Sequence, residues 1–117
     1  MAAVIHNFVL EQGTSLNKKF RWKTNDQSVD LTGFTARSQF REALTSNNVL
    51  IDLSTENAGI VINPSDGLVV LVFRPKHTRG ALWKKAVYDL ELVSPDGLVT
   101  RLVQGHVQLS REVTRND

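Results

Sequence analysis

Cysteine is absent from this sequence of 117 residues, which excludes disulfide bonds, a thiol nucleophile and a thiolate metal site. Long apolar runs are also absent, and none reaches the roughly 18 consecutive residues that a membrane-spanning helix requires. The N-terminal segment lacks the basic stretch and the unbroken apolar run of a signal peptide. We therefore expect a soluble protein, synthesised in a cytoplasm, that makes no membrane contact. Its stability must come from packing and from hydrogen bonds between strands.

The remaining composition is typical of a small globular domain. Hydrophobic residues make up 41% and charged residues 22% of the chain, and the formal net charge is +2. A chain of this length buries one core, so residues 1–117 are predicted to form a single domain, with a flexible polar tail over residues 111–117. So small a net charge does not by itself indicate a nucleic-acid-binding protein.

Hydrophobic side chains alternate with polar ones through most of the chain. This period of two is typical of half-buried strands, and no segment of about 12 residues shows the helical period of 3.6. Clusters of turn residues separate the alternating segments. We predict strands over residues 5–11, 16–23, 34–41, 49–53, 60–62, 68–73, 86–93 and 98–110.

One of these segments, LVVLVF at residues 68–73, has no polar residue in it. An unbroken apolar run predicts a strand that protein covers on both sides. The cover is either the core of the domain or a contact between subunits, and the core is the simpler alternative.

A hairpin over residues 86–110 is predicted to form the centre of the fold. In its first strand, AVYDLELV, apolar residues alternate with Asp89 and Glu91, which form an acidic outer face. The segment SPDG supplies the proline, aspartate and glycine of a tight turn. In the second strand Gly105 lies where a bulge or a close backbone approach is tolerated. The residues predicted to share one face of that strand are Val99, Val103, Val107 and Leu109.

Seven to eight short strands in a chain of this length favour an all-β, antiparallel sandwich, because a lone sheet would leave one apolar face in water. The immunoglobulin-like version fits best, since Tyr88 occupies the place of a tyrosine corner and a leucine follows where immunoglobulin domains carry cysteine. At most one short helical turn is expected, within residues 75–85. There Thr78 is able to cap the turn, and Leu82 and Trp83 are able to pack.

Candidate catalytic groups are few. Asp89 and Glu91 share one strand face about 7 Å apart, within the range of paired catalytic carboxylates, but a solvated face is the preferred interpretation because no cleft-forming residue accompanies them. His6, His77 and His106 lie on separate predicted elements without metal-binding spacing. The sequence contains neither a GxSxG elbow nor a phosphate-binding loop. We therefore expect a protein that is not an enzyme and needs no metal or cofactor.

Basic residues follow the outer faces of two predicted strands. If these strands pair, one positive patch contains Lys19, Arg21, Lys23, Arg37 and Arg41. Three interpretations are open: a solvated face, which is preferred, then a contact with an acidic protein partner, and last a contact with nucleic acid. The acidic strand with Asp89 and Glu91 also makes pairing between subunits conceivable. These residues, together with Trp83, are the candidate protein interface.

Three segments of the chain resemble a family of small bacteriophage proteins and protein domains. They are FVLEQGTSLNKKFRWKTNDQSVDLTGFTARSQFRE, VLIDLST and AVYDLELVSPDGLVTRLVQGHVQLSREVTR, which extend from Phe8 to Arg115. In that family an opening of the form QG…F…W…DLTGYTA…R is followed by a close of the form YDLEL…PDG…RLL.G…VT. Its members are similar to the N-terminal domain of siphophage upper-baseplate proteins.

The resemblance implies an immunoglobulin-like or similar β-sandwich that attaches receptor-binding fibres to a phage tail. It carries over no catalytic residue. Because the chain ends where a longer fibre protein would continue, we expect a free-standing adaptor in the virion. Its expected partners are other tail, baseplate or fibre proteins and further copies of itself. The alternative is a carbohydrate- or host-receptor-binding module, for which Trp83 is the candidate exposed aromatic residue.

Overall fold

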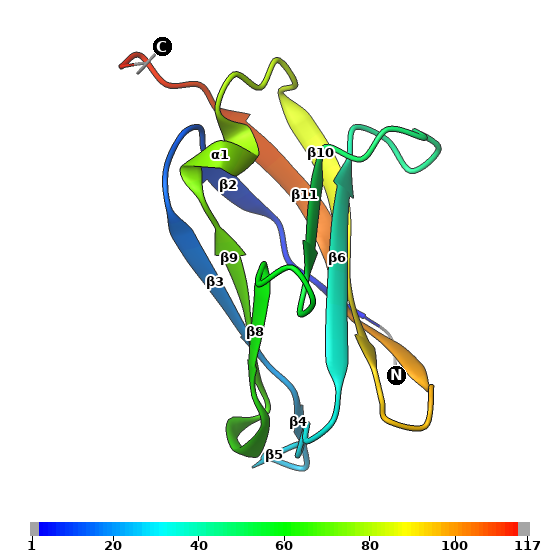
Figure 1. The fold of residues 1–117 in the computed structure, drawn as a ribbon. Helices are drawn as coiled ribbons and strands as arrows, with labels where there is room; N and C mark the ends of the chain where they lie inside the picture. The colour runs from blue at the N-terminus through cyan, green and yellow to red at the C-terminus, as the bar shows by residue number, and fades with distance from the viewer. Residues whose placement is uncertain (1–2, 115–117) are drawn as a thin grey trace.

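The computed structural model describes residues 3–114 of the chain and consists mainly of β-strands (Figure 1). In chain order the strands are β1 (Val4–Ile5), β2 (Phe8–Glu11), β3 (Leu16–Arg21), β4 (Lys23–Thr24), β5 (Gln27–Ser28), β6 (Thr35–Arg41), β7 (Ile51–Ser54), β8 (Ile60–Asn63), β9 (Leu68–Phe73), β10 (Lys85–Val93) and β11 (Val99–Ser110). The helical elements are the 3-10 turn η1 (Pro64–Asp66) and the single turn α1 (Pro75–Thr78). The all-β prediction is confirmed, with η1 as one short turn more than expected.

Six strands form the larger sheet, in the order β1–β11–β10–β6–β7, with β2 also beside β11. β1 and β2 run parallel to β11, whereas all other neighbours are antiparallel. The second sheet has three antiparallel strands in the order β3–β9–β8, and β4 and β5 form a small separate hairpin. The two sheets lie as separate layers in Figure 1, so the arrangement is sandwich-like.

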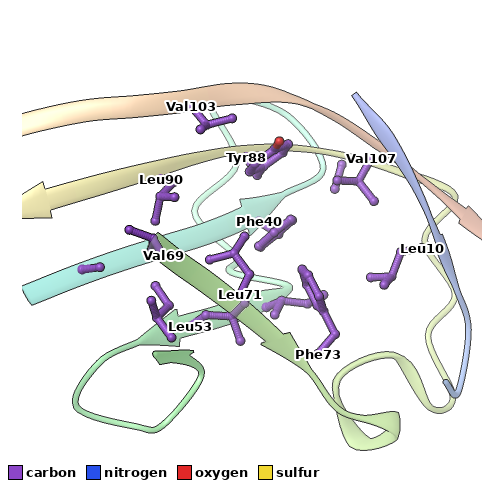
Figure 2. Packing of buried hydrophobic residues seen from close by; sticks show 14 of the residues in the cluster. Leu10, Phe40, Leu53, Val69, Leu71, Phe73, Tyr88, Leu90, Val103 and Val107 are labelled. Atoms are coloured by element: carbon purple, nitrogen blue, oxygen red, sulfur yellow. The ribbon is translucent and has the colours of Figure 1, made fainter. Parts of the chain in front are cut away.

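Buried side chains from both layers meet between the two sheets. Figure 2 shows Leu71 and Phe73 of β9 among side chains of the six-stranded sheet. The fully buried ring of Phe40 stacks on Tyr88 at a centroid distance of 5.0 Å and meets the edge of Phe73 at 5.5 Å. Because successive side chains of a strand point to opposite faces, β6 and β10 bury every second residue. The central core contact therefore joins β6, β10 and β9.

The alternation predicted for the strand at residues 16–23 is confirmed, since Leu16 and Phe20 of β3 turn inward and its charged neighbours outward. β9 differs from its prediction. One side of β9, which carries Val69, is buried, but the other side, which carries Val70, is half-buried. The expectation that protein covers both sides of residues 68–73 is therefore wrong within this chain, because the three-stranded sheet has one face toward the core and one face outward.

The strand predicted over residues 5–11 is divided in two at His6 and Asn7. The His6 N–H donates to the Gln104 carbonyl at 2.9 Å, and the Asn7 Oδ1 accepts from the backbone of β11 at 2.8 Å. A Cβ atom at Gly105 would collide with the His6 carbonyl, so the close backbone approach predicted at this glycine is confirmed. The Tyr88 hydroxyl donates to the same carbonyl at 2.6 Å. This hydrogen bond attaches the N-terminal segment to β10. In a tyrosine corner the hydroxyl bonds the backbone a few residues upstream, so the prediction of such a corner at Tyr88 is wrong.

A β-bulge interrupts β11 opposite the bond between Leu90 and Glu91. Leu90 pairs with Val103 while Glu91 pairs with Arg101, so Leu102 is the additional residue. The bulge shifts the alternation of the strand. Val103, Val107 and Leu109 are buried as predicted, but Val99 on the other side of the bulge is exposed.

The short helical turn expected within residues 75–85 is α1, but its contacts differ from the prediction. Thr78 does not cap the turn with its side chain, because its Oγ1 accepts from the Gly13 N–H at 2.7 Å. Trp83 is 8% exposed and packs in the core as expected. Leu82 beside it is 82% exposed, so the packing expected of Leu82 is wrong. Gln12 is buried in the same region and donates to the Thr78 carbonyl at 3.2 Å.

The predicted flexible tail, residues 111–117, is described as far as Thr114, and the rest of it lies outside the described residues. The Glu112 N–H donates to the Gln12 side-chain oxygen at 3.1 Å. This hydrogen bond attaches the segment after β11 to the end of β2.

We expect Phe40→Ala to lower the free energy of unfolding by about 3–5 kcal/mol, because it empties the space between Tyr88 and Phe73. Leu44→Ala is the control, since this side chain is 88% exposed and its removal should change stability by less than about 0.5 kcal/mol. Chemical denaturation of both variants measures the difference, and equal losses would contradict this description of the core.

We expect stability to fall as the pH is lowered through about 6.5, because burial, with Lys18 nearby, lowers the pKa of His6, and burial with Lys76 and Arg74 lowers the pKa of His77. In this range the unfolded chain binds protons that the folded chain does not, so acid favours unfolding. Thermal melts of the wild type and of His6→Gln/His77→Gln between pH 7.5 and 5.5 measure the effect. The double variant should lose most of the pH dependence, and an unchanged slope would contradict the assignment.

Candidate protein interface

Charged and amide side chains from three neighbouring strands gather on the outer side of the six-stranded sheet. β10 lies in the middle, with β6 on one side and β11 on the other. We call this side the charged face, and its members are Arg37, Gln39, Arg41, Asp89, Glu91, Arg101 and Gln104. The strand register places Glu91 between Arg37 and Arg101, because all three are cross-strand neighbours.

Two ion pairs cross the charged face. Arg37 Nε lies 2.9 Å from Glu91 Oε1, and Arg101 Nε lies 3.5 Å from Asp89 Oδ2. More than half of each arginine side chain is exposed, so these pairs contribute little to stability. Their effect is to orient the side chains and to balance the charges of Asp89 and Glu91 with arginines of the same chain.

Asp89 has a raised pKa although an arginine lies beside it. Burial is the main cause and the neighbouring Glu91 carboxylate adds to it, whereas Arg101, Arg37 and Arg41 act in the opposite direction. The distance to Arg101 is long for an ion pair, so the attraction does not fully offset the cost of partial burial. Ionisation of Asp89 is therefore less favourable than that of a fully exposed aspartate.

A groove with a volume of about 370 Å³ runs over the charged face. Its lining includes Val87 and Asp89 from β10 together with Arg41, Ile5 and Leu44. Ile5 is 70% exposed and Leu44 is 88% exposed, so apolar side chains stand free beside the polar ones. Arg41 is held in place, since its Nη1 donates to the Ser46 carbonyl at 2.7 Å and its Nη2 to Gln39 Oε1 at 2.8 Å. Apolar groups next to oriented charges are typical of protein contact surfaces.

The candidate residues from the sequence divide between two sides of the molecule. Arg37, Arg41, Asp89 and Glu91 come together on the charged face. Lys19 and Arg21 lie on β3 in the other sheet, and Lys23 lies on β4. β3 pairs with β9, whereas β6 pairs with β10 and β7, so the strand pairing that the single basic patch required does not occur. Trp83 is buried in the core and does not present its ring to a ligand or partner.

Arg101 and Gln104 belong to the charged face but are not among the interface residues predicted from the sequence. Strict alternation with Val103 and Val107 places Arg101 on the inner side of β11. The bulge at Leu102 reverses this, so that Arg101 and Gln104 both face outward, with Arg101 Nη1 3.4 Å from Gln104 Oε1. The adjacent apolar pair Leu102 and Val103 was the available signal, because two buried neighbours do not fit a strict period of two.

Residues 3–114 contain no group of three or more histidine, aspartate or glutamate side chains placed to hold a metal ion. In the same part of the chain, no helix is long and apolar enough to cross a membrane. No protein-family model matches the chain, and no curated protein matches it.

We expect Asp89→Asn to leave the melting temperature at pH 7 unchanged or to raise it, because the substitution removes a partly buried carboxylate that lies beside Glu91. The matched control is Glu91→Gln, which loses the 2.9 Å pair with Arg37 and should cost about 0.2–1 kcal/mol. Thermal melts of both variants test this order. A less stable Asp89→Asn protein would show that its pair with Arg101 outweighs the cost of burial.

Proposed function

We propose that this protein is a structural, non-enzymatic component of a bacteriophage virion. In this proposal it is an adaptor of the tail or baseplate that joins fibre or receptor-binding components to the tail through protein contacts. Its partners are other tail, baseplate or fibre proteins and further copies of the chain. The phage assignment is supported by the sequence resemblance from Phe8 to Arg115.

The observation that carries the contact role is the groove over the charged face. Its apolar groups, Ile5 and Leu44, are largely exposed, and its arginines are oriented by hydrogen bonds and ion pairs. Apolar anchors supply most of the affinity of a protein contact, while ordered charges around them select the partner and its orientation. A surface with both features is suited to a fixed position in an assembly.

We further propose that the sandwich is immunoglobulin-like. The strand order supports this, since β3–β9–β8 corresponds to one immunoglobulin sheet (B, E and D) and β11–β10–β6–β7 to the other (G, F, C and C′). β1 and β2 take the place of the first immunoglobulin strand, and here they pair with β11, which corresponds to G. Tyr88 lies on the strand that corresponds to F, although its hydroxyl bonds His6.

The alternative of a carbohydrate- or receptor-binding module is less well supported. Sugar binding generally uses an aromatic ring that is open to the ligand. Trp83 is buried, and no phenylalanine, tyrosine or tryptophan among residues 3–114 is among the exposed large hydrophobic side chains.

The test is the protein content of purified phage particles, measured by quantitative mass spectrometry. Wild-type protein should be present in a fixed ratio to the major tail proteins. We expect Leu44→Glu to reduce incorporation by at least about fivefold, because the loss of an apolar anchor costs more than about 1 kcal/mol. Leu82→Glu is the matched control, since Leu82 is 82% exposed, close to the 88% of Leu44, but lies outside the groove.

Both variants should melt like the wild type, which separates loss of contact from loss of folding. Absence of the wild-type protein from purified particles refutes the virion assignment. Normal incorporation of Leu44→Glu refutes the role of the groove.

A further inference from the structure

The outer side of the three-stranded sheet carries a second surface, on the opposite side of the sandwich from the groove. The strand register places Lys19 of β3 beside Val70 of β9, and Val70 beside Val61 of β8. Two residues further along the same pair of strands, Arg21 lies beside Leu68. We call this surface the basic apolar face, and its members are Lys19, Arg21, Val61, Leu68, Val70 and Val72.

The apolar part of this face lies on β9, the strand whose sequence predicts cover on both sides. Within this chain only its inner side is covered, because Leu68, Val70 and Val72 on the outer side are half-buried. Val61 beside them on β8 is 53% exposed. A central strand of the composition LVVLVF is typical of sheets that are covered on both faces. A partner on the outer side would supply the cover that the chain itself does not.

The charge on the basic apolar face has one sign. The strands β3, β8 and β9 contain no aspartate or glutamate, and the side chains of Lys19 and Arg21 make no ion pair or hydrogen bond with any described residue. Asp66 lies on η1, which connects β8 to β9, and its carboxylate accepts from Asn63 Nδ2 at 3.0 Å. On the charged face, in contrast, Arg37 and Arg101 are each paired with a carboxylate.

We infer that the basic apolar face docks a different protein, whose contact surface has an apolar centre bordered by aspartate or glutamate. Carboxylates on the partner would meet Lys19 and Arg21, and apolar side chains would cover Val61 and Val70. This contact goes beyond the groove contact of the proposed function. With both surfaces in use the domain bridges two partners, and that consequence alone rests on the proposed function.

A second copy of the chain does not fit this face. In a two-fold contact the same patch meets itself, and the patch holds no carboxylate that could pair with Lys19 and Arg21 of the other copy. Like charges across a contact are destabilising. A contact with the charged face of another copy is no better, because Asp89 and Glu91 already have arginine partners in their own chain.

The test uses the full-length chain, produced from its own gene in the cells that normally make it, and a zero-length carbodiimide that joins an amine to a carboxylate. Mass spectrometry then identifies what is joined to Lys19. We expect an aspartate or glutamate of a different protein. The variant Val61→Gln/Arg21→Gln keeps the reactive Lys19 amine, adds no carboxylate beside it, and should reduce the yield of that cross-link at least tenfold.

The matched control is Leu82→Gln/Arg79→Gln, which likewise replaces one apolar residue and one arginine with glutamine, on exposed positions outside the three strands. It should cross-link like the wild type, and all variants should melt at similar temperatures. A link from Lys19 to a second copy, no link from Lys19, or an equal yield in both double variants would overturn the inference. A partner that is absent from phage particles would support this surface but refute the bridging of two virion proteins. The virion proposal itself fails only if the protein is absent from purified particles, so the two outcomes are distinguishable.

Discussion

Burial of the Phe40 ring between Tyr88 and Phe73 is the contact on which the arrangement of the two sheets depends. Phe40 and Tyr88 belong to neighbouring strands of the six-stranded sheet, and Phe73 belongs to the central strand of the other sheet. Aromatic side chains bury more apolar area than other residues, so this cluster supplies a large share of the favourable energy between the layers. Once these rings point inward, the alternation of each strand decides which side chains point outward.

The same tyrosine links the core to the N-terminal strands. Its ring packs in the core, while its hydroxyl donates to the His6 carbonyl, and burial raises the pKa of Tyr88 so that the hydroxyl keeps its proton. The glycine at position 105 allows the His6 backbone to approach β11 closely enough for this bond. The position of β1, and with it the exposed Ile5 beside the groove, therefore follows from a residue more than 80 positions away in the chain.

The outer faces of the two sheets differ in how their charges are balanced. On the charged face Arg37 and Arg101 have carboxylate partners within the chain, so their charges are already balanced and oriented before any contact. On the basic apolar face Lys19 and Arg21 have none among the described residues, so the sign of a partner's charge matters. In the two proposals made above, each face would hold a different neighbour.

The sequence by itself determined the strand class, most strand positions and the inward residues of β3, β6 and β10, because a period of two directly records which side of a strand is buried. It did not determine which strands pair, so it placed Lys19 and Arg37 in one patch although they lie in different sheets. It left Trp83 open between packing in the core and an exposed contact, and it missed that a bulge turns Arg101 outward. These features depend on contacts between residues far apart in the chain, and local alternation carries no information about such contacts.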